Sequence, residues 1–119
     1  MSPIQRVPRR YLLGTFWCAC IVIGVLALVP ATTPLPSTGW DKSNHALAFA
    51  ALAFTGGACW PANLVRMLVG LAAYGGAIEI AQTFTETRFG EWGDWFADLV
   101  GLLVVAVYLA WRRGRRAPY

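Results

Sequence analysis

The residues of this chain that are able to do chemistry lie beside or inside apolar segments. The stretch AIEIAQTF, residues 77–84, places Glu79 and Gln82 within an otherwise apolar run. Residues three apart lie on one face of a helix, so the carboxylate and the carboxamide point the same way. A charged group at the centre of a membrane helix costs about 2.5–3.5 kcal/mol on insertion scales, and such groups face a partner inside the protein. We therefore expect Glu79 to face the interior of the bundle and to have a partner there.

Two further segments repeat this pattern of polar residues on one helix face. Asp41 and Lys42 precede His45 by four and three residues, and Asp94 precedes Asp98 by four. These spacings place the side chains of each segment together. Carboxylates, an ammonium group and an imidazole are groups that bind phosphates, carboxylates and metal ions or transfer protons.

Catalysis and metal binding are the two most specific readings of these residue types. His45 is a candidate general acid or base, oriented by Asp41 or Asp94, with Glu79 beside it. No nucleophilic serine motif or glycine-rich phosphate loop supports an enzyme, so a binding protein is favoured and no catalytic residue is assigned. His45, Glu79, Asp94 and Asp98 form a His-plus-carboxylate set, but one histidine is thin support for a transition metal. We therefore predict no metal and no cofactor.

The composition places these residues in a membrane protein. The 119 residues are 57% hydrophobic and only 13% charged, with six Trp and four Tyr. A soluble domain of this size needs more charge to cover its surface, and aromatic residues of this kind collect at membrane interfaces. The net charge of +4 comes from residues that flank apolar segments and form no stripe on a soluble face. Nucleic-acid binding is therefore excluded, because it requires a basic surface on a soluble domain.

Four apolar segments predict an all-α bundle of four transmembrane helices. Each segment is close to the roughly 20 residues that span a bilayer, and the turns between them are short, so neighbouring helices should be antiparallel. The predicted helices cover about 11–30, 44–60, 63–84 and 94–111. They form a transmembrane domain over 11–111, between a basic N-terminus (1–10) and a basic tail (112–119).

The cysteines carry no sign of a metal or redox site. Cys18 and Cys20 are two residues apart and face different ways on a helix, and Cys59 ends another apolar run. No CxxC motif or Cys/His pair is present. We predict free thiols that face lipid or the core.

The distribution of Lys and Arg predicts the orientation. With four spans, eight basic residues fall on the side of the two termini, and Lys42 and Arg88 fall on the other. The eight are Arg6, Arg9, Arg10, Arg66, Arg112, Arg113, Arg115 and Arg116. Because basic residues are retained on the cytoplasmic side, both termini should be cytoplasmic.

The acidic residues all fall on the opposite, outer side. Asp41, Glu79, Glu86, Glu91, Asp94 and Asp98 are the six, and His45 enters the second helix from the same side. At 1.5 Å per residue, Glu79 and Asp98 lie at about 7 and 6 Å depth. His45, Glu79 and Asp98 should therefore share one layer. Stripes of small residues, such as Ala46, Ala50 and Gly57, let the helices approach closely enough for this.

These motifs also resemble those of a known family. DKSNHALAF, then IEIAQ, then an R-x5-D-x3-D-x2-G pattern resemble the VanZ-like family of small bacterial membrane proteins. The matching residues are Asp41, Lys42, His45, Glu79, Gln82, Arg88, Asp94 and Gly101. Asp98 departs from the pattern, which usually has Asn there. The resemblance covers about residues 40–103.

The resemblance implies a protein of the bacterial cytoplasmic membrane with a functional cluster at the outer mouth of the bundle. The founding member of the family is linked to low-level resistance to the glycopeptide teicoplanin, and its biochemical activity is not established. The ligand expected at the cluster is a lipid headgroup, a cell-wall precursor or a glycopeptide. An enzyme acting on a lipid-linked or cell-wall intermediate and a purely structural cluster are the alternatives. The oligomeric state is left open.

Overall fold

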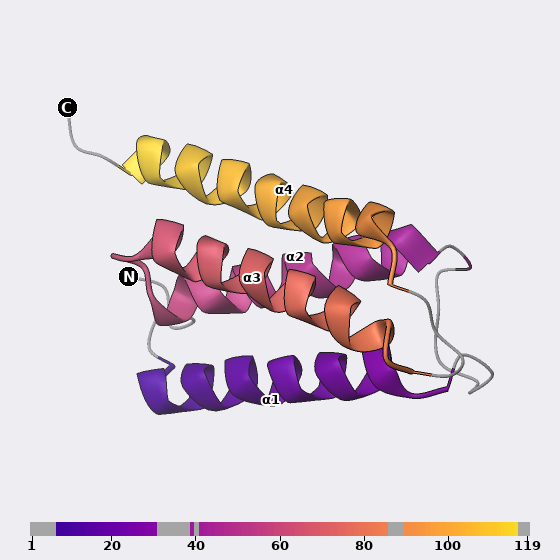
Figure 1. The fold of residues 1–119 in the computed structure, drawn as a ribbon. Coiled ribbons are helices and arrows are strands. Elements are labelled where there is room, and N and C mark those ends of the chain that lie inside the picture. The colour runs from indigo at the N-terminus through magenta and orange to yellow at the C-terminus, as the bar shows by residue number, and fades with distance from the viewer. Residues whose placement is uncertain (1–6, 31–38, 40, 86–89, 117–119) are drawn as a thin grey trace.

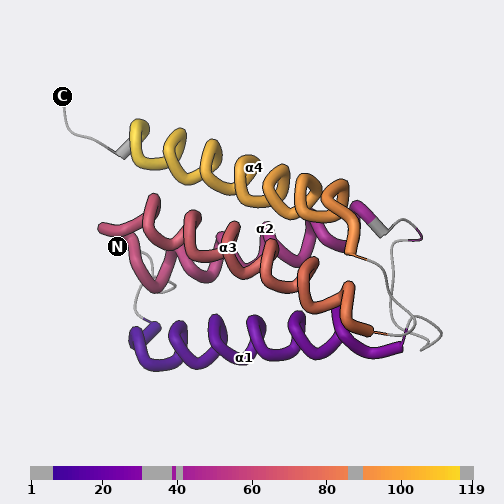
Figure 2. The backbone as a smooth tube through the Cα atoms, in the orientation of Figure 1, coloured from indigo at the N-terminus to yellow at the C-terminus, as the bar shows by residue number. Residues whose placement is uncertain are grey.

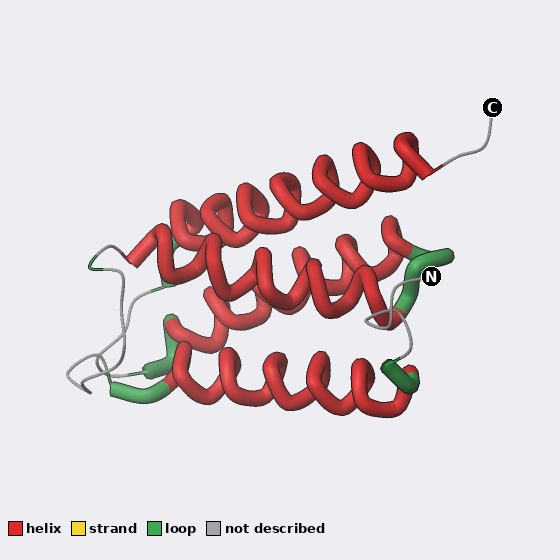
Figure 3. Tube along the Cα trace, turned by 180° about the vertical axis from the view of Figure 1, so that it is seen from behind, coloured by secondary structure: helices red, strands yellow, loops and turns green. Residues whose placement is uncertain are grey.

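All regular structure in the described part of the chain is helical. The computed structural model describes residues 7–30, 39, 41–85 and 90–116, in which no strand occurs (Figure 3). The helices are α1 (Arg9–Leu28), α2 (Asp41–Cys59), α3 (Leu64–Gln82) and α4 (Trp92–Arg116). Successive helices run in opposite directions and pack side by side (Figures 1 and 2). The predicted all-α class, the number of helices and their antiparallel order are confirmed.

Two helix boundaries differ from the prediction by more than two residues. α2 begins at Asp41, three residues before the predicted start, so Lys42 is part of its first turn. α4 continues to Arg116, five residues beyond the predicted end at Trp111. Arginine has a high helix propensity, and positive charge at the C-terminus of a helix complements the helix dipole. The RRGRR segment is therefore the last turns of α4.

Three of the described helices, α1, α3 and α4, are long and apolar enough to cross a membrane. Their outer faces expose large apolar side chains, such as Ile21 on α1, Val69 on α3 and Leu103 on α4. Exposed apolar surface on this scale is typical of a protein that meets lipid or another protein.

Among the four described helices, α2 is not one of these three span candidates, and it is the helix most enclosed by the others. Phe49, Leu52 and Ala53 are almost completely buried, and α2 packs most extensively against α4. A side chain that faces other helices does not have to be soluble in lipid. The polar first turn of α2 (DKSNH) is what lowers its hydropathy.

Small residues bring α2 and α4 into contact at backbone distance. A methyl group added at Gly101 of α4 would overlap the carbonyl oxygen of Ala46 and lie 3.1 Å from the backbone nitrogen of Ala50. At Gly57, an added methyl group would lie 2.7 Å from Leu109 of α4. The predicted stripe of small residues on α2 thus faces α4, and Gly101 is the glycine on which the closest approach depends.

Hydrogen bonds from side chains to main-chain carbonyls join α1 to the other helices. The Tyr74 hydroxyl of α3 donates to the Cys20 carbonyl, and Gln82 Nε2 donates to the Ala27 carbonyl at 2.8 Å. Arg9 Nε donates to the Cys59 carbonyl at the end of α2, at 3.1 Å. The last contact supplies a donor to the unpaired carbonyls of a helix C-terminus.

The three cysteines are free, as predicted. Cys18 is exposed, whereas Cys20 and Cys59 are buried. The two thiols of α1 therefore do face different ways.

Candidate functional site

The polar side chains gather at the end of the bundle where α2 begins, α3 ends and α4 begins (Figure 1). We call this group the polar cluster. It consists of Lys42, His45, Glu79, Glu91, Asp94 and Asp98. All the buried polar or charged residues in the described ranges lie at this end: Glu79, Gln82, Asp94 and Asp98.

His45 of α2 stands between two carboxylates of α4. Its Nδ1 atom lies 3.0 Å from Asp98 Oδ1, and its Nε2 atom lies 3.7 Å from Asp94 Oδ2. The four-residue spacing of Asp94 and Asp98 stacks the two carboxylates on one face of α4. The short contact is with Asp98, whereas the sequence favoured Asp41 or Asp94 as the residue that orients the imidazole.

Lys42 forms the exposed rim of the cluster. Its Nζ atom lies 3.2 Å from Asp94 Oδ1 and 3.4 Å from Glu91 Oε2. The hydrogen bond to Asp94 raises the pKa of Lys42 above its ordinary value, so the ammonium group stays charged at neutral pH. Asp94 thus contacts both Lys42 at the rim and His45 below it, and links the exposed part of the cluster to the buried part.

Glu79 lies in the last turn of α3 and is only 2% exposed. Its Oε2 atom accepts a hydrogen bond from the main-chain N–H of Glu91, at 2.9 Å. Glu91 immediately precedes α4, and a carboxylate there satisfies a donor at the helix N-terminus and complements the helix dipole. The other oxygen, Oε1, has no hydrogen-bond partner among the described residues.

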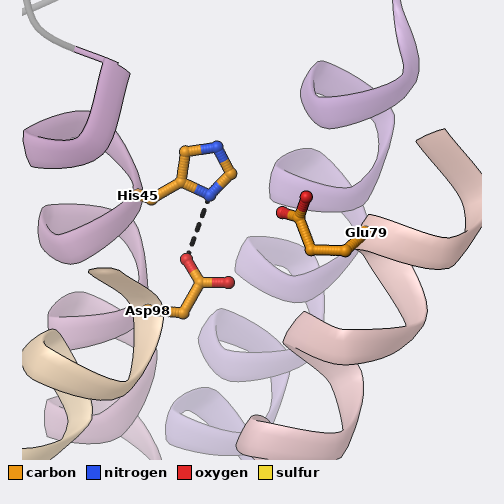
Figure 4. A group of neighbouring side chains, drawn as sticks. All are labelled: His45, Glu79 and Asp98. Carbon is orange, nitrogen blue, oxygen red and sulfur yellow. Dashed lines mark hydrogen bonds and ion pairs between the residues drawn. The ribbon is translucent and has the colours of Figure 1, made fainter. Parts of the chain in front are cut away.

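His45, Glu79 and Asp98 converge on one point between α2, α3 and α4. One ligand atom from each lies within 4.8 Å of the other two. Figure 4 shows the Glu79 carboxylate directed toward the imidazole and the Asp98 carboxylate. The structure thus brings together three of the predicted site residues. Chemically, the arrangement is able to share protons or to hold a cation.

A glycine on α3 makes room for Asp98. A methyl group at Gly75 would lie 2.8 Å from Asp98 Oδ2 and 3.2 Å from the Phe49 ring. Gly75 is four residues before Glu79, so it lies on the same face of α3. A larger residue at Gly75 would push the carboxylate out of its buried position.

Among the predicted site residues, Gln82 does not join the polar cluster, and two others cannot be placed. Gln82 turns toward α1, where it donates to the Ala27 carbonyl. Arg88 and the side chain of Asp41 lie outside the described residues. Glu91 belongs to the cluster but was not singled out from the sequence. Its spacing of three residues from Asp94 is the signal that could have identified it.

An apolar cavity of about 540 Å³ lies apart from the polar cluster, between α1 and α3. Phe16, Trp17, Met67 and Tyr74 are among its lining residues, and no member of the polar cluster is. The ionisable groups and this cavity are therefore separate features.

No protein-family model, no curated protein and no solved structure matches this chain. The resemblance to VanZ-like proteins therefore rests on the motifs of the chain itself.

Proposed function

We propose that this chain is a four-span protein of the bacterial cytoplasmic membrane, of VanZ-like type, that binds the polar headgroup of a lipid or lipid-linked cell-wall precursor. The observation that supports it is the concentration of all buried polar and charged side chains, among those described, at one end of an apolar bundle. A purely structural polar cluster would not require an imidazole, an ammonium group and several carboxylates at the same end.

The proposal extends the number of membrane spans from the three apolar helices to all four helices. α2 is the fourth span in this proposal, because its enclosure by the other helices offsets its lower hydropathy. The described ends of the chain lie at the end of the bundle opposite the polar cluster (Figure 1), as do Arg9, Arg66 and Arg113. The positive-inside rule then places the polar cluster at the outer surface.

The rim residue Lys42 supplies the contact for a phosphate. An ammonium group has three N–H donors, and the described structure engages Lys42 with two acceptors, Asp94 and Glu91. Arg88, which follows α3 in the sequence, is the second candidate cation. The apolar faces of α1, α3 and α4 keep the rim at the level of the headgroups.

A binding assay on the full chain tests this function. The protein is placed in nanodiscs of phosphatidylcholine, and binding of a fluorescent undecaprenyl phosphate and of phosphatidylglycerol is measured. Lys42→Gln should weaken binding about tenfold, as expected for a lost charge-assisted contact of roughly 1.5 kcal/mol. Arg66→Gln, at the opposite end, is the control and should bind as the native protein does. Equal binding by the native protein and Lys42→Gln argues against the proposal.

The glycopeptide is distinguished in the same assay. If teicoplanin binds in a Lys42-dependent way and neither phospholipid does, the antibiotic is the ligand. A strain that lacks the gene and is complemented with His45→Ala or Glu79→Gln separates a functional cluster from a structural one. Full complementation by both variants would identify the cluster as structural.

A second candidate function is catalysis at the outer leaflet. The observation that favours it is the position of His45 between Asp98 and Asp94, an arrangement that orients an imidazole for general acid or base chemistry. Incubation of the purified protein with a lipid-linked intermediate either yields product in a His45-dependent way or does not. Binding without turnover supports the first candidate.

A further inference from the structure

We propose that His45, Glu79 and Asp98 bind one divalent transition-metal ion, with Zn²⁺ and Mn²⁺ as the best-suited ions. The metal site uses the same polar cluster as the proposed function but does not depend on headgroup binding. Any contact between the ion and a phosphate does rest on that function.

The spacing of the donor atoms fits a single ion. Metal bonds to imidazole nitrogen and carboxylate oxygen are about 2.0–2.2 Å long, which places adjacent ligand atoms about 3 Å apart. His45 Nδ1 and Asp98 Oδ1 are 3.0 Å apart, and the ligand atom of Glu79 lies within 4.8 Å of both. Small side-chain movements bring the third atom to bonding distance, because all three helices already place their ligands around one point (Figure 4).

Glu79 provides a second and independent indication of a ligand. The residue is 98% buried, since 2% is exposed, and its Oε1 atom has no hydrogen-bond partner among the described residues. A buried carboxylate oxygen without a partner carries a large desolvation cost. A cation held between Glu79 and Asp98 would remove this cost, and the carboxylate already faces the position that the ion would occupy.

The charge balance of the cluster also favours a cation. The described members comprise four carboxyl groups, on Glu79, Glu91, Asp94 and Asp98, against the ammonium group of Lys42 and the imidazole of His45. Acidic groups therefore outnumber basic groups in the described cluster, so its ionised carboxylates leave an excess of negative charge. A divalent ion offsets two of these charges and makes the outer end less repulsive toward a phosphate.

The donor set narrows the choice of ion. Imidazole suits zinc, copper, iron and nickel, and carboxylates suit magnesium, calcium and manganese, so one nitrogen with two carboxylates favours zinc or manganese. Three protein ligands leave an open position on zinc, as in catalytic rather than structural sites. Asp94 lies on the other side of the ring, 3.7 Å from Nε2. A carboxylate in that position, which does not itself bind the metal, orients a metal-bound histidine.

Metal titration of the purified full chain tests the proposal. The protein is freed of metal with a chelator, placed in phosphatidylcholine nanodiscs, and titrated by calorimetry with ZnCl₂ and with MnCl₂ alone. We expect one ion per chain for at least one metal and a higher unfolding temperature when it is bound. Glu79→Gln and Asp98→Asn should each weaken binding at least tenfold, because the loss of a group that only orients a metal ligand already costs about 10–100-fold in affinity. Arg66→Gln, a carboxamide substitution at the opposite end of the bundle, should not.

Measurements on the native protein test the metal site if the variants do not fold. X-ray absorption at the zinc edge should show a shell of nitrogen and oxygen with one imidazole and no sulfur. No binding by the native protein at millimolar metal, a sulfur ligand, or unchanged binding in Glu79→Gln and Asp98→Asn would each overturn the site. Metal binding without headgroup binding would contradict only the proposed function, and headgroup binding by metal-free protein that takes up no ion would contradict only the metal site.

Discussion

The two ends of the bundle differ in the burial and the contacts of their charged side chains. At the end that carries the described termini, Arg66 and Arg113 are exposed, and Arg9, also exposed, donates to a main-chain carbonyl and not to a buried side chain. At the other end, Glu79 and Asp98 are buried and held against residues from other helices. An exposed charge can be moved along its helix at little cost, whereas a buried one depends on specific neighbours. The basic end is therefore evidence for the orientation of the chain, and the polar end is evidence for a site with specific contacts.

The largest effect expected from this difference is an all-or-none accessibility to a thiol reagent. In a chain whose native cysteines are replaced by alanine, Glu91→Cys should react in intact cells with a membrane-impermeant maleimide. Arg113→Cys should react only after the cells are opened, because the proposed orientation places it in the cytoplasm. Both positions are exposed, so access to the side chain is not limiting. The reverse pattern would invert the orientation and place the polar cluster in the cytoplasm.

The next largest effect is expected at the contact between α2 and α4 that supports the polar end. Gly101→Val should destabilise the protein by about 3 kcal/mol, the upper range for overpacking, because a side chain there meets the α2 backbone. Gly70→Val on α3 is the control, since nothing lies within 4 Å of its added methyl group. Unfolding in detergent, followed by circular dichroism, gives both values. Equal stability of the two variants would show that α2 and α4 are not packed as described.

The sequence predicted the helices and the convergence of the cluster because both follow from simple periodicities. Apolar length defined the four segments, and three- and four-residue spacings placed His45 and Asp98 on faces that could meet. The hydrogen-bond partner of each side chain could not be predicted. Each residue points about 100° away from the one before it around the helix axis, so a small rotation of a helix changes which neighbour a side chain meets. Gln82 shares a face with Glu79, yet it bonds to Ala27 on α1, which the spacing alone does not reveal.

A double-mutant cycle measures how strongly the polar end is coupled. His45→Ala, Asp98→Ala and the double variant should yield a coupling free energy of about 1.5 kcal/mol, near the largest values for side-chain hydrogen bonds in membranes. Asp98 is fully buried, the His45 side chain is 14% exposed, and their contact is 3.0 Å. The cycle of Lys42 and Glu91 is the control, because exposed ion pairs typically couple by about 0.2–1 kcal/mol. A larger coupling at the rim than between His45 and Asp98 would reverse this ranking.

The smallest effect is expected away from the polar cluster, where α3 contacts α1. Tyr74→Phe removes the hydrogen bond to the Cys20 carbonyl and should cost about 0.6 kcal/mol, the average for such bonds between membrane helices. The cost stays low because the carbonyl keeps its partner four residues on within the helix, so no buried group loses its only bond. At the polar end, by contrast, loss of a partner leaves a buried carboxylate uncompensated, and its full desolvation cost then destabilises the protein. Unfolding measurements on Tyr74→Phe that gave a loss above about 2 kcal/mol would show that α1 depends on this bond. The main difference in stability would then be between α1, weakly attached to the rest, and the other helices, and not between the two ends of the bundle.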